Sequence, residues 1–288
     1  MRVAAGMLVV MVATAHADAV FEFHDPMSKA VSKLTVGRVL VRDRMLEVNL
    51  SDLDPGCGPP TGPPHRPSFS FPLPPGPGGS YFAGAKFGVP AFAATEQSMG
   101  MGLGSQGIAI TVAPFKLAAD VHVRGTIDVG DYGTGTFDAI VCPQVDASKL
   151  RALPKTAPDK PFSGTAAGGA FAMRSAFATV DRQSDSYTTL LGVQMFAEAG
   201  VTCATRDKAK GRQLRLADIG GASTSRKLVG SPQPAIAGLD EGSFDRDAVW
   251  VQLDKLSFKP GDTIAGRAVV DAPGTSLGGT FTAPICGR

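Results

Sequence analysis

Alternating apolar and polar positions are the dominant pattern along this chain. Each half contains seven or eight such runs, separated by turn residues such as Gly220-Gly221 and Pro260-Gly261. Successive side chains of a β-strand point to opposite faces, so each run predicts a half-buried strand. In the second half the runs fall near 162–172, 176–181, 188–196, 212–218, 226–230, 248–254, 263–270 and 278–285. Strands at this spacing, with no amphipathic helices between them, predict antiparallel two-sheet sandwiches.

Composition supports this prediction. Glycine (35) and proline (22) make up about a fifth of the 288 residues, which suits many short strands joined by turns better than a helical protein. Hydrophobic residues reach 43% against 19% charged, enough apolar mass to form real cores. The length fits two domains of ordinary size.

The four cysteines suggest an internal duplication. Cys57 and Cys203 are 146 residues apart, and Cys142 and Cys286 are 144 apart. None of them is at C-x-x-C spacing, which excludes a zinc knuckle or a thioredoxin-like motif. The nearly equal offsets indicate two halves of similar length.

Other segments repeat at a similar offset. Residues 135–142 align without a gap on residues 279–286 and share the pattern G-T-F-x-A-x-x-C. Residues 46–50 likewise match 191–195. The alternative is coincidence among strands of similar composition. We therefore predict an all-β protein with two tandem antiparallel β-sandwich domains that arose by internal duplication.

Duplication also favours one disulfide pairing. Four cysteines allow three connectivities, and only Cys57 with Cys142 and Cys203 with Cys286 gives both halves the same bridge. The expected domains are residues 18–142, with Pro/Gly-rich insertions at 59–67, 72–79 and 99–107, and residues 162–288. A Pro-rich linker, residues 143–161, joins them.

The N-terminus has the pattern of a secretory signal. An apolar stretch over residues 3–13 precedes Ala15-His16-Ala17, which predicts a signal peptide at 1–17 and a mature chain beginning at Asp18. A buried N-terminal strand or helix is the alternative. The stretch is too short to cross about 30 Å of hydrocarbon, so no membrane span is expected. We expect a soluble periplasmic or extracellular protein, where disulfides persist.

With its duplication and its G-T-F-x-A-x-x-C strands (Gly135–Cys142 and Gly279–Cys286), the chain resembles uncharacterised exported β-domain proteins of high-GC Gram-negative bacteria. Domains of those proteins often end in a G-x-F-x-A-x-x-C strand. The resemblance implies a location and a fold, and no activity.

No cofactor motif has the right structural context. Residues 102–107 spell G-x-G-x-x-G, but the following apolar run predicts a strand, whereas dinucleotide binding needs a helix there. Asp240, Glu241, Asp245 and Asp247 could hold Ca²⁺, although they miss the EF-hand spacing, and a solvated loop is favoured. Trp250 alternates with two valines and is expected in a core or between domains rather than as an exposed platform.

Catalytic signals are equally sparse. His24, His65 and His122 show no metal-ligand spacing, and no G-x-S-x-G elbow occurs. A site assembled by folding, such as His122 with an Asp and a Ser, stays open. We predict no catalytic, cofactor or metal residues, and assign the four cysteines to disulfides.

The charge balance bears on partners. The formal net charge is +2, and falls to +1 once the signal with Arg2 is removed, so no field attracts nucleic acid or an anionic membrane. We favour an exported non-enzymatic protein that is structural or binds an unknown protein or cell-surface partner. The alternative is a secreted hydrolase or carbohydrate-active protein with a site in the first domain's loops or at the domain interface.

Overall fold

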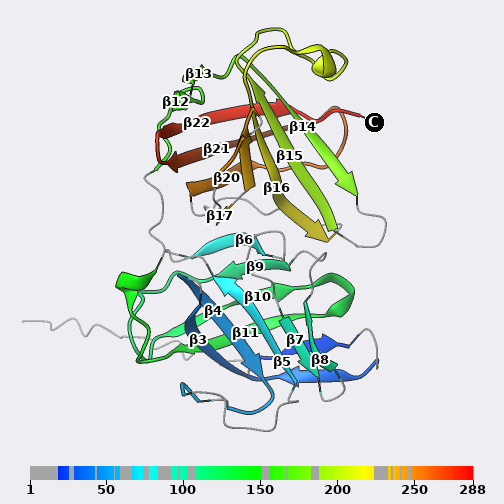
Figure 1. The fold of residues 1–288 in the computed structure, drawn as a ribbon. Helices are drawn as coiled ribbons and strands as arrows, with labels where there is room; N and C mark the ends of the chain where they lie inside the picture. The colour runs from blue at the N-terminus through cyan, green and yellow to red at the C-terminus, as the bar shows by residue number, and fades with distance from the viewer. Residues whose placement is uncertain are drawn as a thin grey trace, which may run out of the picture.

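The computed structural model is all-β, which confirms the predicted fold class (Figure 1). In the part of the chain that it describes, the helical segments are short 3-10 turns. Among the residues that the structure describes, no helix has the length and apolar character needed to cross a bilayer. The structure describes residues 19–25, 29–42, 44–54, 56–58, 67–73, 78–83, 92–95, 98–102, 108–150, 156–166, 168–182, 188–223, 233–234, 236–240, 242–244 and 248–287.

The strands of the first half form one sheet. Its order is β6-β9-β10-β11-β3-β4-β5-β7-β8, and β1 joins β2 to β11. The strands are β1 (Phe21–His24), β2 (Val31–Leu34), β3 (Val36–Arg42), β4 (Met45–Ser51), β5 (Ser68–Leu73), β6 (Gly79–Ala83), β7 (Phe92–Thr95), β8 (Ser98–Gly102), β9 (Ile108–Val112), β10 (His122–Asp128) and β11 (Thr134–Val141).

The strands of the second half form two sheets, ordered β13-β12-β22-β21-β20-β17 and β14-β15-β16-β18-β19. The strands are β12 (Ser163–Ala166), β13 (Gly169–Ala172), β14 (Ser175–Arg182), β15 (Thr188–Phe196), β16 (Gln213–Ser223), β17 (Gln233–Pro234), β18 (Ile236–Leu239), β19 (Gly242–Ser243), β20 (Val249–Lys255), β21 (Thr263–Ala272) and β22 (Thr275–Pro284).

The two halves have the same pairing order. Subtracting eleven from each strand number of the second half reproduces the pairings of the first half. Each half has two groups of antiparallel strands, which we call its arms; in the first half they are β1, β2, β6 and β9–β11, and β3–β5 with β7 and β8. The halves differ in the number of sheets because their two arms are joined differently. Strand β11 pairs in parallel with β3 through three residue pairs, whereas its counterpart is the single parallel bridge between Ala178 and Ile285. That bridge is too short to merge the second half into one sheet.

Each half has its own hydrophobic core. In the first half the core contains Phe69 and Phe71 of β5 together with Ile110 of β9 and Phe137 of β11, so side chains from both arms of the sheet meet. The main core of the second half likewise contains side chains from both of its sheets. Strands β6 and β9 of the first half contact β16 of the second, so the halves touch (Figure 1).

The repeated motif holds the first and last strands of each half together. A Cβ on Gly135 would lie 2.3 Å from the Val20 oxygen, and one on Gly279 would lie 2.5 Å from the Lys160 oxygen. The next residue, Thr136 or Thr280, donates its backbone N–H to that same oxygen, at 3.0 and 2.8 Å. Glycine is needed there because any side chain would push the two strands apart.

The motif's phenylalanine covers a glycine on the neighbouring strand in both halves. Phe137 pairs with Gly125 across β10 and β11, and Phe281 pairs with Gly266 across β21 and β22. A Cβ on Gly125 would lie 2.7 Å from the Phe137 ring, and one on Gly266 would lie 3.0 Å from that of Phe281. An aromatic ring over a strand glycine fixes the register of such a pair.

One predicted strand is in fact two. The run at 162–172 folds as the hairpin β12–β13, because Gly168 and Gly169 adopt φ angles of 88° and 118°, a backbone conformation that favours glycine and turns the chain. The run expected at 226–230 lies outside the described residues.

Candidate functional site

The structure contains both disulfides that the sequence predicts. Cys57 is bonded to Cys142 and Cys203 to Cys286, each with Cα atoms 5.5 Å apart. In each half the bond links the loop between the fourth and fifth strands to the end of the last strand. Cys142 directly follows β11, and Cys286 lies two residues after β22. The four cysteines therefore serve as two matched clamps, one per half.

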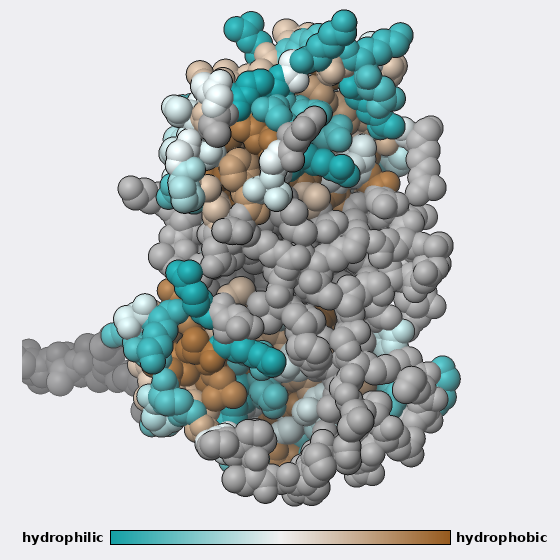
Figure 2. Space-filling view, viewed as in Figure 1, coloured by the Kyte–Doolittle hydropathy of each residue, from teal (hydrophilic) through white to brown (hydrophobic). Residues whose placement is uncertain are grey.

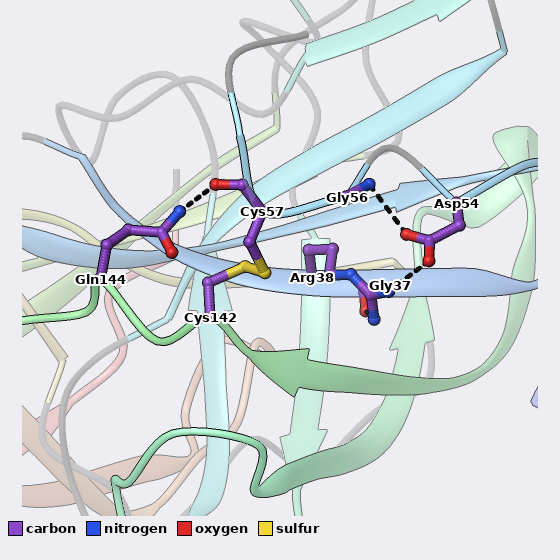
Figure 3. Close-up of a disulfide and its surroundings, with 7 residues drawn as sticks. All are labelled: Gly37, Arg38, Asp54, Gly56, Cys57, Cys142 and Gln144. Atoms are coloured by element: carbon purple, nitrogen blue, oxygen red, sulfur yellow. Dashed lines mark hydrogen bonds and ion pairs between the residues drawn. A yellow bond between two sulfur atoms is a disulfide. The ribbon is translucent and has the colours of Figure 1, made fainter. Parts of the chain in front are cut away.

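Polar residues surround the first bond. Arg38 of β3 makes an ion pair with Asp54 at 2.5 Å, and Asp54 accepts the Gly56 N–H at 2.8 Å. Gln144 donates its side-chain N–H to the Cys57 carbonyl, so the loop is held from both sides (Figure 3). These contacts hold the loop through groups other than the two sulfur atoms.

Aromatic residues surround the second bond. Phe177 and Phe196 stack with ring centroids 5.3 Å apart and form a small apolar cluster with Cys286, against which Cys203 packs. In the shared pairing order, Phe177 takes the place of Arg38. The two halves therefore have a disulfide at the same place in the fold, with polar neighbours in the first half and aromatic neighbours in the second.

An exposed ion-pair cluster lies on the outer face of β10 and β11. His122 Nδ1 lies 2.5 Å from Asp138 Oδ1, and Arg124 Nε donates to Asp138 Oδ2 at 2.7 Å. The side chains of His122 and Arg124 are 46% and 47% exposed. No further partner for the Arg124 Nη groups or His122 Nε2 occurs among the described residues. These donors can therefore meet acceptor groups of another molecule.

The pKa of Asp138 reflects these contacts. Burial of the carboxyl raises its pKa, but the hydrogen bonds from Arg124 and His122, with their positive charges, outweigh burial and hold the pKa of Asp138 below its usual value. The carboxylate of Asp138 therefore stays ionised at neutral pH and accepts hydrogen bonds from both neighbouring side chains.

Half-buried apolar side chains lie beside this cluster. Val36 and Leu40 of β3 and Ile140 of β11 point away from the core, since they alternate with the core residues Val39 and Val141. Figure 2 shows apolar surface in the described part of the first half, where Figure 1 places β3 and β4. We call the set the outer patch; it comprises Val36, Arg38, Leu40, His122, Arg124, Asp138 and Ile140.

The second half lacks this combination. The strand registers place Ser175, Thr179 and Pro284 where the outer patch has its three apolar residues. The ion-pair cluster is replaced by Thr263, Ala265 and Thr282. Because the frameworks match, the outer patch distinguishes the described residues of the first half from those of the second.

Further polar residues on the outer face are buried or half-buried. Asn49 of β4 stands between Arg38 and Ser70 in the strand register, and Ser70 is 6% exposed although it faces away from the core. Glu47, 7% exposed, makes an ion pair with Arg42 at 3.4 Å. These residues lie beside Arg38 on the same face and form a polar border of the outer patch.

The remaining histidines do not join His122 in the described structure. His24 ends β1 and is exposed, while His65 lies outside the described residues. The described residues contain no group of three side chains that could hold a metal ion. Sequence reasoning singled out His122 but missed Arg124 and Asp138, since only the register of β10 against β11 brings Asp138 to them.

Other candidate segments have structural roles where they are described. Asp240 accepts hydrogen bonds from Arg212 Nε at 3.2 Å and from the Gln213 N–H at 3.1 Å, while Glu241 and residues 245–247 lie outside the described residues. Gly102 ends β8, and β9 follows as the expected strand, with 103–107 not described. Trp250 is 3% exposed, so it is no exposed platform.

Comparison of the chain with known protein families, curated proteins and solved structures gives no significant match. The outer patch is the surface in which the described residues of the two halves differ most in character, and it is therefore the candidate site.

Proposed function

We propose that this chain is an exported, non-enzymatic protein built from two duplicated β-modules, which binds a protein or cell-surface partner through the outer patch. The supporting observation is the contrast between the halves on a common framework. At half-buried and exposed outward positions the common fold does not require apolar or charged residues, so a surface that combines both among the described residues of the first half, and not at the equivalent described positions of the second, supports a contact.

The composition of the outer patch suits a protein partner. Specific interfaces combine an apolar centre with a polar rim and are enriched in arginine. Val36, Leu40 and Ile140 supply the centre, and Arg124 and His122 supply outward donors. The two disulfides support a periplasmic or extracellular location, because such bonds persist in oxidising compartments. The proposed signal peptide, residues 1–17, lies outside the described residues.

Site-specific photocrosslinking tests this proposal. A benzoylphenylalanine at the exposed Thr126, two residues from Arg124 on β10, should give a defined crosslinked product in the exported fraction of producing cells. The matched control carries the same probe at the exposed Thr282, which occupies the Asp138 position in the second half. Equal products from both positions would contradict the proposal.

A swap variant provides the second arm. Val36→Ser, Leu40→Thr and His122→Thr install the second half's residues in the first half without touching the core. We expect the crosslinked product to disappear while the circular dichroism spectrum and unfolding midpoint stay close to those of the parent. A product that persists in a folded swap variant would rule out the outer patch as the binding surface.

Hydrolysis is the second candidate function, since His122 with Asp138 is the base-and-orienter half of a hydrolase triad. The second carboxylate oxygen of Asp138 is bonded to Arg124, which makes the pair part of a surface cluster. A fluorophosphonate probe distinguishes the two functions: serine labelling that is lost in His122→Thr would support the hydrolase.

A further inference from the structure

Each disulfide joins one accessible cysteine to one buried cysteine. Cys57 and Cys203, in the loops, are partly exposed. Cys142 and Cys286, at the ends of the last strands, are 0% and 7% exposed. In a folded chain with reduced cysteines, an incoming oxidant would therefore reach the loop thiol first. In both halves the loop cysteine is the more exposed of the two, although the residues around the two bonds differ.

The bonds also join cysteines that are consecutive in the chain. Cys57 pairs with Cys142, and both precede Cys203 and Cys286, which pair with each other. Each bond lies within the strands of its own half. The first bond can therefore form before the second half is complete, and no bond has to be broken and rearranged to reach the native pairing.

Contacts other than the sulfur–sulfur bond already hold each loop thiol over its partner. In the first half these are the Arg38–Asp54 ion pair and the Gln144 hydrogen bond to the Cys57 carbonyl. In the second half, Ser175 Oγ accepts the Val201 N–H at 3.2 Å, and Glu198 accepts the Gly211 N–H at 3.2 Å. None of these contacts involves a sulfur atom, so they can form while the cysteines are reduced and bring each loop thiol to its partner.

We propose that Cys57 and Cys203 are the sites at which a disulfide-bearing oxidant, a thiol oxidoreductase or glutathione disulfide, acts on this chain, and that Cys142 and Cys286 complete each bond. The loop thiolate attacks the oxidant's disulfide, which forms a mixed disulfide and releases one oxidant thiol. The buried thiolate then attacks the loop sulfur and releases the second. The two cysteine sulfurs lose two electrons and two protons, and the oxidant's disulfide gains them as two thiols. This inference is independent of the proposed function.

The test uses the full chain, with glutathione disulfide as the oxidant. In Cys142→Ser, refolded with the second bond intact, the mixed disulfide cannot be resolved, so glutathione should accumulate on Cys57. In the matched variant Cys57→Ser, Cys142 should be modified more slowly, on the order of tenfold or more, because a buried thiol reacts only after local opening. Acid quenching, alkylation and peptide mass mapping identify the modified residue. Cys286→Ser and Cys203→Ser repeat the comparison in the second half.

A measurement on the parent chain guards against misfolded variants. Oxidation of the reduced, refolded parent is quenched at short times, and transient glutathione adducts are mapped. Adducts mainly on Cys57 and Cys203, with the native bonds as the first protein disulfides, would support the proposal. Adducts equally frequent on Cys142, or early bonds between Cys57 and Cys203, would overturn it.

Discussion

Removing the Cys57–Cys142 bond should selectively destabilise the first half. In the chain-entropy model the loss depends on the length of the closed loop, and 85 residues correspond to about 4.6 kcal/mol at 25 °C. Replacement of both cysteines by alanine avoids a free thiol. The second bond closes 83 residues, so Cys203→Ala with Cys286→Ala should cost nearly the same, about 4.6 kcal/mol.

The single tryptophan allows the two halves to be followed separately. Trp250 is the only tryptophan in the chain and lies in β20 of the second half, where it is 3% exposed. Its fluorescence therefore reports unfolding around β20, while far-ultraviolet circular dichroism reports both halves. In urea, the first-half variant should show an earlier dichroism transition with little change in the fluorescence midpoint. The second-half variant should shift the fluorescence midpoint.

Two outcomes would refute this reasoning. A loss below about 1 kcal/mol for either bond would show that the chain-entropy model does not describe these loops. An equal shift of the fluorescence midpoint in the first-half variant would show that the contact of β16 with β6 and β9 makes the halves unfold as one unit.

Three further outcomes are expected. Phe137→Ala and Phe281→Ala should each cost about 3 to 5 kcal/mol, measured by urea unfolding, and a large difference between them would contradict their equivalent roles. Gly125→Ala should destabilise far more than Gly58→Ala in the same assay, because its Cβ would collide with a backbone oxygen at 2.1 Å, whereas that of Gly58 meets nothing within 4 Å. The pKa of Asp138 is lowered in the folded protein, so the ionised carboxylate contributes about 1 kcal/mol or less to the free energy of unfolding at this exposure. This stabilisation is present above the ordinary pKa of about 3.9 and is lost as the pH falls through the folded pKa. Asp138→Asn should therefore lower the urea midpoint at pH 7 and not at pH 2.

The fold class was predictable because strand alternation and turn residues are local signals. The run at 263–270 matches β21, and the run at 278–285 lies largely within β22, since both strands have one face in a core. The disulfide pairing was predictable from the cysteine offsets, because nearly equal spacing in the two halves reflects equivalent positions relative to the strands. The hairpin β12–β13 was missed because Gly168-Gly169 lies in a continuous run of small and apolar residues, with no charged residue or proline to mark the turn.

The outer patch could not be found from the sequence in the same way. Its members come from β3, β10 and β11, and β3 is nearly a hundred residues from β11 along the chain, so only the parallel register of Ile140 against Arg38 brings them together. Alternation correctly places His122 and Arg124 on one face of one strand, but says nothing of which strand lies next to it. Register between distant strands is set by the packing of the whole sheet.

The contact between the halves joins surfaces that do not correspond. Strands β6 and β9 of the first half meet β16 of the second, whereas the counterpart of β16 is β5 and the counterparts of β6 and β9 are β17 and β20. The association is therefore heterologous rather than a pseudo-twofold, and the two halves have different neighbours at equivalent positions. Equivalent substitutions in the two halves need not have identical effects. This asymmetry places different constraints on the two halves, so a surface feature of one half need not be present in the other.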